Sequence, residues 1–141
     1  MKNKINTIFT IGVLIFISMA CNASFSTANL SELTFGKDKN ATATSGTFKP
    51  EDQIFAISAV NNASGKNKAK FRVLFDKVDG SQSGSVAYNL ENEMEVEGSR
   101  SFWFTIPDGL APGSYKVELV LKDEDGKELD RKTGGFTVNS N

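Results

Sequence analysis

The sequence predicts an all-β protein: a single antiparallel β-sandwich of about seven strands that follows an N-terminal export signal. Three observations predict it. From Phe48 onward, short segments of alternating apolar and polar residues recur roughly every ten residues, with turn residues between them. No long segment after the N-terminal signal has the apolar period of a helix. Eleven phenylalanines, two of them in the signal, supply apolar side chains for a core without disulfides.

The N-terminal segment, residues 1–20, has the order of a secretory signal peptide. Lys2 and Lys4 come before an apolar run from Ile8 to Met19, and small residues come directly after it. The run is shorter than the ~20 residues that a membrane-spanning helix needs. We therefore expect export and removal of this segment.

The only cysteine, Cys21, stands where cleavage is expected. The run Ser18-Met19-Ala20-Cys21 resembles a bacterial lipobox, although Ser18 replaces the usual leucine. The resemblance implies cleavage before Cys21, a lipid on Cys21, membrane attachment through that lipid and, with Asn22 next, the outer membrane. The alternative is ordinary signal-peptidase cleavage after small residues, which gives a periplasmic or secreted protein.

The mature chain divides into a flexible tether and one domain. Residues 21–29 are small and polar, which indicates a tether, and residues 30–141 form the predicted sandwich domain. Strands are expected over Leu30–Phe35, Gln53–Val60, Lys68–Val78, Ser101–Ile106, Ser114–Lys122 and Glu128–Val138. Residues 84–98 fit two short strands, an irregular crossover or a short helix.

Three details of this pattern are specific enough to test. Gln53–Val60 is apolar on both faces, which is typical of a central strand. Asp123–Lys127 predicts a tight hairpin turn, and part of a calcium loop is the weaker interpretation. Gly134-Gly135 suggests a bulge in the last strand.

The C-terminal part carries a resemblance to a known class of domains. Phe102-Trp103-Phe104, Leu110-Ala111-Pro112-Gly113-Ser114-Tyr115 and Phe136-Thr137-Val138 resemble segments of immunoglobulin-like and fibronectin-III-like domains of bacterial envelope proteins. The resemblance implies an immunoglobulin-like sandwich. It also implies a structural corner at Pro112, Gly113 and Tyr115, in which the tyrosine hydroxyl bonds back to upstream backbone. A single cysteine excludes the inter-sheet disulfide of antibody domains, and Trp103 lies too late for their conserved tryptophan.

The composition argues against catalysis and against several kinds of ligand. The chain has no histidine, which removes the commonest general base and metal ligand, so we expect no enzyme, no metal and no cofactor. The formal net charge is −1; loss of Lys2 and Lys4 leaves 14 basic against 17 acidic residues, a charge of −3. Such a balance gives no reason to expect nucleic acid as a partner.

Two surface features are candidates for an interface. Trp103 is the one aromatic on its strand face, and it anchors an interface if residues 84–98 leave it uncovered. Lys66, Lys68, Lys70 and Arg72 alternate on one strand face, where they meet lipid headgroups, acidic glycan or an acidic partner, or simply solvent. Glu91, Glu93, Glu95 and Glu97 alternate in the same way and indicate a solvated sheet edge that discourages aggregation.

These observations favour a non-catalytic exported protein of the cell envelope. We expect a lipid-anchored binding or assembly module that contacts a protein or a surface glycan. The alternative is a secreted or periplasmic protease inhibitor that uses residues 61–67 or 107–113 as its inserting loop.

Overall fold

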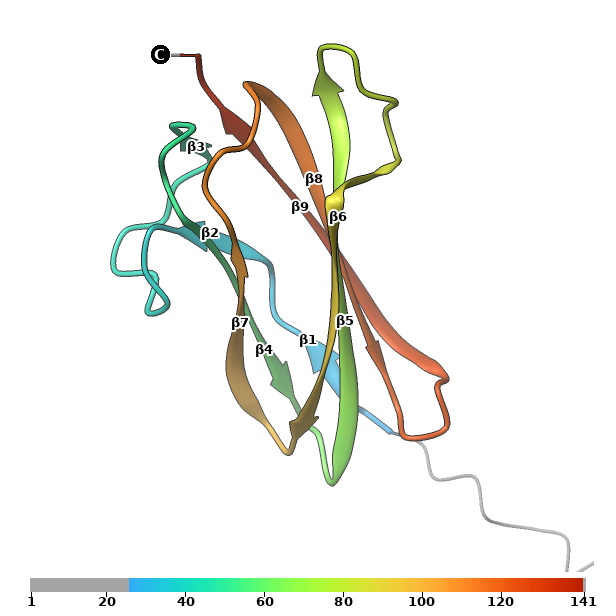
Figure 1. Ribbon diagram of the computed structural model, residues 1–141. Helices are drawn as coiled ribbons and strands as arrows, with labels where there is room; N and C mark the ends of the chain where they lie inside the picture. The colour runs from blue at the N-terminus through green and yellow to red at the C-terminus, as the bar shows by residue number, and fades with distance from the viewer. Residues whose placement is uncertain (1–25, 141) are drawn as a thin grey trace, which may run out of the picture.

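The computed structural model describes residues 26–140, which form two β-sheets packed face to face (Figure 1). The described residues contain nine strands and no helix. The predicted all-β sandwich is therefore confirmed.

The first sheet is built around β4 (Ile54–Asn61). Along one edge of β4 lie two short strands, β1 (Asn29–Leu30) and β2 (Thr34–Gly36), and along the other lies β7 (Arg100–Ile106). All three pairings are antiparallel. The central place of β4 confirms the prediction from its two apolar faces.

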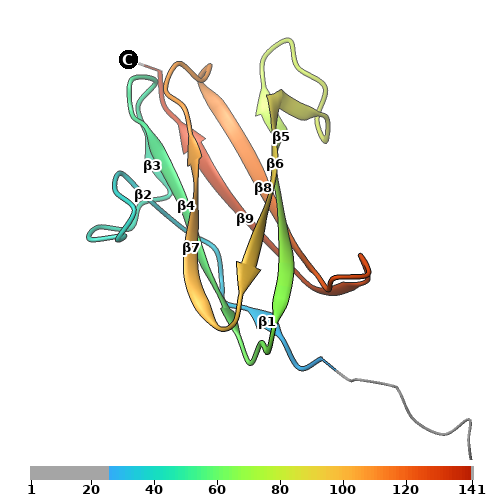
Figure 2. The ribbon, with the colours of Figure 1, turned by 60° about the horizontal axis from the view of Figure 1, so that its bottom comes forward.

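The second sheet is wider, with the strand order β3-β9-β8-β5-β6 (Figures 1 and 2). Its strands are β3 (Thr47–Phe48), β5 (Lys66–Val78), β6 (Val86–Glu97), β8 (Gly113–Lys122) and β9 (Glu128–Val138). Only the β3–β9 pair in this sheet is parallel. Because β1 and β2 share one edge of β4, the first sheet is narrower than the second. β6 is an edge strand of the second sheet.

The core lies between the sheets and is rich in aromatic rings. The predicted inward residues of β7, β8 and β9 are buried: Phe102, Phe104, Ile106, Tyr115, Val117, Leu119, Leu121, Phe136 and Val138. Phe71 of β5 stacks on Phe104 of β7 with ring centroids 4.5 Å apart, which joins the two layers. Tyr115 stacks on Phe136 at 5.2 Å. Alternation of period two thus locates the core correctly.

Residues 84–98, which the sequence leaves open, form the strand β6 rather than a helix. β6 is interrupted by a bulge: four residues, Ala87–Leu90, lie opposite Val73 alone in β5. Tyr88 and Asn89 have positive φ angles of 51° and 57° in this bulge. The alternative of two short strands is therefore close to the observed form, because pairing with β5 is broken at the bulge.

Several expected boundaries differ from the structure. Leu30–Phe35 is divided into β1 and β2, because the Ser31 hydroxyl accepts the Ala59 N–H at 2.8 Å in place of a strand carbonyl. The expected tether ends earlier, since Ala28 is buried and Asn29 begins β1. With the short β3, this division raises the strand count from about seven to nine.

The expected bulge at Gly134-Gly135 is wrong. β9 pairs with β8 in continuous register through both glycines, and the irregularity lies instead near Leu121 and Lys122. A Cβ on Gly134 would lie 3.0 Å from the Phe35 ring, so the missing side chain admits the ring of β2 against β9. Gly134 therefore allows the two sheets to approach closely and does not mark a bulge in β9.

Candidate interaction surfaces

The two outer faces of the sandwich differ sharply in chemistry. The outer face of the five-stranded sheet is charged: the four basic residues of β5 pair in register with four glutamates of β6. The opposed pairs are Lys66–Glu97, Lys68–Glu95, Lys70–Glu93 and Arg72–Glu91. We call this surface the charge ladder. The outer face of the first sheet carries apolar side chains instead.

Ion pairs occupy most of the basic row that the sequence offers as an interface. Lys66 Nζ lies 3.1 Å from a Glu95 carboxylate oxygen, and Lys70 Nζ lies 3.2 Å from one of Glu91. Arg72 is 2.6 Å from Glu118 of β8. The sequence shows both charged rows but not their pairing, which removes the electrostatic reason to expect an acidic ligand on this face.

Glu118 lies at the centre of the charged face. Its side chain is 14% exposed and also lies 2.7 Å from Arg131 of β9. Burial alone would raise the pKa of Glu118, but hydrogen bonds from Arg72 and Arg131 outweigh it and lower the pKa below its usual value. The carboxylate therefore joins three strands as a charged group at neutral pH.

Trp103 lies on the outer face of the first sheet and is 45% exposed. Ile57 of β4 stands directly opposite it in the sheet, and Phe55 and Ala59 flank Ile57 on the same face; all three are only partly buried. Lys39 Nζ lies 5.5 Å from the Trp103 ring centroid. We call Phe55, Ile57, Ala59 and Trp103 the Trp103 patch. β6 does not cover it, so Trp103 is available as an anchor.

A groove, which the sequence did not indicate, opens between β6 and β7. It has a volume of about 180 Å³, and its lining includes the stacked rings of Phe71 and Phe104, with Leu90 and Asn92 of β6. Figure 1 shows the two strands leaving a shared turn and diverging, and Figure 2 shows the same separation from a second direction. We call this feature the β6–β7 groove. Its position depends on the unequal widths of the two sheets, which no local pattern reports.

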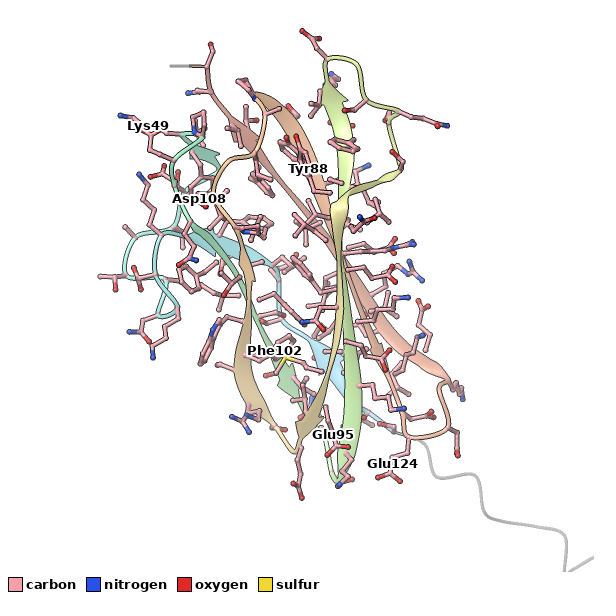
Figure 3. All side chains as sticks on the ribbon, in the orientation of Figure 1. Lys49, Tyr88, Glu95, Phe102, Asp108 and Glu124 are labelled. Carbon is pink, nitrogen blue, oxygen red and sulfur yellow. The ribbon has the colours of Figure 1, made fainter. Side chains whose placement is uncertain are left out.

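The predicted corner at Pro112, Gly113 and Tyr115 has the geometry that the resemblance implies. The Tyr115 hydroxyl donates a hydrogen bond of 2.7 Å to the Ala111 carbonyl oxygen. The Ala111 N–H donates to the Tyr88 hydroxyl at 3.3 Å, so two tyrosines hold Ala111 through its N–H and its carbonyl. Figure 3 shows Tyr88 near the end of the sandwich where this corner lies.

The loops proposed as inhibitory elements are short or anchored. Leu110, within 107–113, is buried, and Gly109 N–H donates to the Pro50 carbonyl oxygen at 2.7 Å. Residues 62–65 form a short connection between β4 and β5, with Asn62 and Gly65 at positive φ. Neither segment extends away from the sandwich as an inserting loop does.

The acidic turn 123–127 is a hairpin, as predicted. Lys127 N–H donates to the Asp123 side chain at 2.8 Å, and Gly126 has a φ of 86°. Beside it lies a hollow of about 300 Å³ that Asn67 also lines, and Asn67 Nδ2 is buried without a hydrogen-bond partner. Within residues 26–140, no three side chains among His, Cys, Asp and Glu are grouped for a metal ion.

The predicted signal peptide and the lipidation residue Cys21 lie outside the described residues. Within 26–140, no helix has the length and hydropathy needed to cross a bilayer. No protein-family model matches the sequence, and no curated protein matches it significantly.

Proposed function

We propose that this protein is a non-catalytic binding module of the cell envelope, attached to the outer membrane by a lipid on Cys21, and that it contacts a protein partner through the Trp103 patch. The observation that carries the proposal is the exposure of Trp103 beside partly buried aliphatic and aromatic side chains on one sheet face. A large exposed indole with apolar neighbours is typical of a protein interface.

The contrast between the two outer faces supports the choice of surface. Three of the four basic residues of the charge ladder already form ion pairs, whereas the Trp103 patch leaves apolar area in contact with water. Phe55, Ile57 and Ala59 together favour a protein over a glycan, because none of the three side chains carries a hydrogen-bonding group for a sugar hydroxyl.

The strand order supports an immunoglobulin-like or fibronectin-III-like domain. A narrow sheet of β1 or β2, β4 and β7 faces a sheet of β3, β9, β8, β5 and β6, and a tyrosine corner precedes the body of β8. Domains of this architecture serve many functions, so the architecture is compatible with the proposal and does not by itself select it.

The anchor is tested by replacing the cysteine. Cys21→Ser should move the protein from the membrane fraction to the soluble fraction of the envelope, because a serine cannot receive the thioether-linked lipid. The intact mass of the mature N-terminus should show the added acyl chains in the natural protein. Membrane association of Cys21→Ser, or an unmodified mature N-terminus, would contradict the anchor.

The surface is tested by photo-crosslinking in intact cells. A photoreactive amino acid at position 103 should give a discrete crosslinked protein band. The same group at Thr133, which is exposed on the outer face of the other sheet, is the matched control and should give none. Equal crosslinking from both positions, or none from 103, would contradict the proposed surface. The described loops offer no feature that favours the protease-inhibitor alternative.

A further inference from the structure

Apart from the Trp103 patch, the sandwich has a second notable feature, the edge of β7 that faces away from β4. This edge has room for a further strand, and no strand of residues 26–140 lies there. β7 pairs with β4 along one edge and with no described strand along the other. In a two-layer sandwich, each strand of one sheet packs against the facing layer about 10 Å away. β7 faces β5 through the Phe104–Phe71 stack, so the position beyond β7 faces β6.

The inner face of β6 has side chains that suit a covering strand. Val96, Met94 and Asn92 share the inner face because they stand opposite Asn67, Ala69 and Phe71 of β5. Val96 is buried near the turn that joins β6 to β7, but Met94 and Leu90 are only partly buried, and Asn92 is exposed. Burial thus falls from Val96 to Asn92 as the two strands diverge along the β6–β7 groove (Figure 1).

Most of the open edge of β7 lacks the usual protection against strand addition. Natural edge strands carry charges, prolines or bulges that prevent pairing with other chains. Arg100, the first residue of β7, is its one charged residue; residues 101–106 contain no charge, no proline and no glycine, and every residue after Ser101 is aromatic or β-branched. The edge strand of the other sheet, β6, carries four glutamates. Protection therefore extends along β6 but is limited to the first residue of β7.

We propose that the β6–β7 groove binds one extended segment of a partner protein, which adds to β7 as a further strand; this inference rests on the proposed function as a binding module. Alternate side chains of the segment enter the groove above Phe71, Phe104 and Leu90. The side chains that enter must therefore be apolar. The intervening side chains lie on the outer face beside Trp103.

Packing geometry excludes a second copy of this chain that pairs through its own β7 strand. If two copies paired through their β7 strands, the β5 strands beneath them would also have to be neighbours. The space between those β5 strands is already filled by β6 of each copy.

The lining of the groove defines the segment further. Glu91 lines the groove, but its carboxylate lies 3.2 Å from Lys70 Nζ, and the other glutamates of β6 stand opposite basic residues of β5. The charges beside the groove are therefore balanced and do not select basic or acidic ends. The occupant is an extended segment whose alternate side chains are apolar, as in a loop or a terminal tail.

Trp103, the only tryptophan of the chain, reports strand addition because it lies on β7. The probe is a synthetic peptide of about nine residues that alternates valine and threonine and has lysine at both ends. Added to the purified full chain, it should shift Trp103 fluorescence in a saturable way below about 1 mM. A peptide with proline at every second position should give no shift, because it lacks the N–H groups that pair with β7.

Two matched variants localise the effect. Met94→Lys places a charge on the inner face of β6 and should abolish the shift, whereas Glu95→Gln alters the outer face of the same strand and should retain it. Leu90→Lys repeats the test if circular dichroism shows that Met94→Lys does not fold. Absence of a saturable shift, an equal shift with the proline peptide, or a shift retained in a folded groove variant would overturn the proposal.

Sedimentation of the chain alone tests whether a segment of a second copy, and not a partner protein, occupies the groove. A concentration-dependent dimer that Met94→Lys abolishes would show that a second copy fills the groove and would overturn the proposal. These measurements use purified protein and do not depend on membrane attachment or on crosslinking at position 103. If these measurements overturned the groove proposal, the tests of the proposed function would be unaffected.

Discussion

At the scale of single residues, the tyrosine corner gives the clearest prediction. Tyr115 is 2% exposed and donates to the Ala111 carbonyl oxygen at 2.7 Å; burial raises the pKa of its hydroxyl above the usual range, so the donor persists at neutral pH. Tyr115→Phe should lower the free energy of unfolding by about 1–3 kcal/mol, because the carbonyl loses its partner. Urea denaturation measures the change.

The other tyrosine of the corner supplies the control. Tyr88 is 49% exposed, and its contact with Ala111 N–H is long, at 3.3 Å. Tyr88→Phe should therefore change stability by less than about 0.5 kcal/mol, since water can replace the lost acceptor. Equal urea midpoints for Tyr115→Phe and the natural protein would contradict a stabilising role for the corner.

Position 113 requires glycine because of its backbone conformation and its close packing. Its φ is 146°, and a Cβ there would overlap the Lys77 carbonyl oxygen and lie 2.7 Å from Val78 Cγ2. Gly113→Ala should lower the unfolding free energy by more than about 1 kcal/mol, because both the conformation and the space are unsuitable. Gly46→Ala, where no atom lies within 4 Å and φ is ordinary, should be nearly neutral. A neutral Gly113→Ala in thermal denaturation would contradict this geometry.

At the scale of strands, Glu118 connects β5, β8 and β9 and makes stability depend on pH. Its pKa is lowered in the folded state, so its stabilisation is fully present above the unfolded value of about 4.5 and is lost as pH falls through the folded pKa. The difference in unfolding free energy between the natural protein and Glu118→Gln should be constant near neutral pH and shrink below about pH 4.5. Denaturation over a pH series measures it, and a difference that grows toward acid would contradict the assignment.

Strand identity could be predicted from local alternation, but strand pairing could not. The period of two placed Phe102, Phe104 and Ile106 in the core, because side-chain direction follows from the strand itself. The partner of Lys70 depends on register across the β5–β6 pair, which involves residues more than twenty positions apart. For this reason two charged rows looked like separate surfaces in the sequence, although they form one ladder.

At the scale of the whole molecule, the N-terminal strands hold the two sheets together. β1 and β2 belong to the narrow sheet, whereas β3 pairs with β9 of the wide one. Leu30 N–H also donates to Asp130 of β9 at 2.8 Å, which links the layers near the start of the domain. The sequence could not show that residues 28 and 29 belong to the fold, because Ala28 and Asn29 are small and stand in a polar segment, and only contact between the sheets gives them a place.

This arrangement predicts that the first strand contributes to global stability despite its two-residue length. Leu30 is buried between the sheets, so Leu30→Ala should lower the unfolding free energy by about 2–5 kcal/mol through lost burial and an unfilled cavity. Thr27→Ala, three residues earlier and exposed, should change it by less than about 0.5 kcal/mol. Urea unfolding followed by Trp103 fluorescence measures both. A Leu30→Ala midpoint equal to that of Thr27→Ala would mean that the sandwich closes without β1, and the domain would then begin at β2.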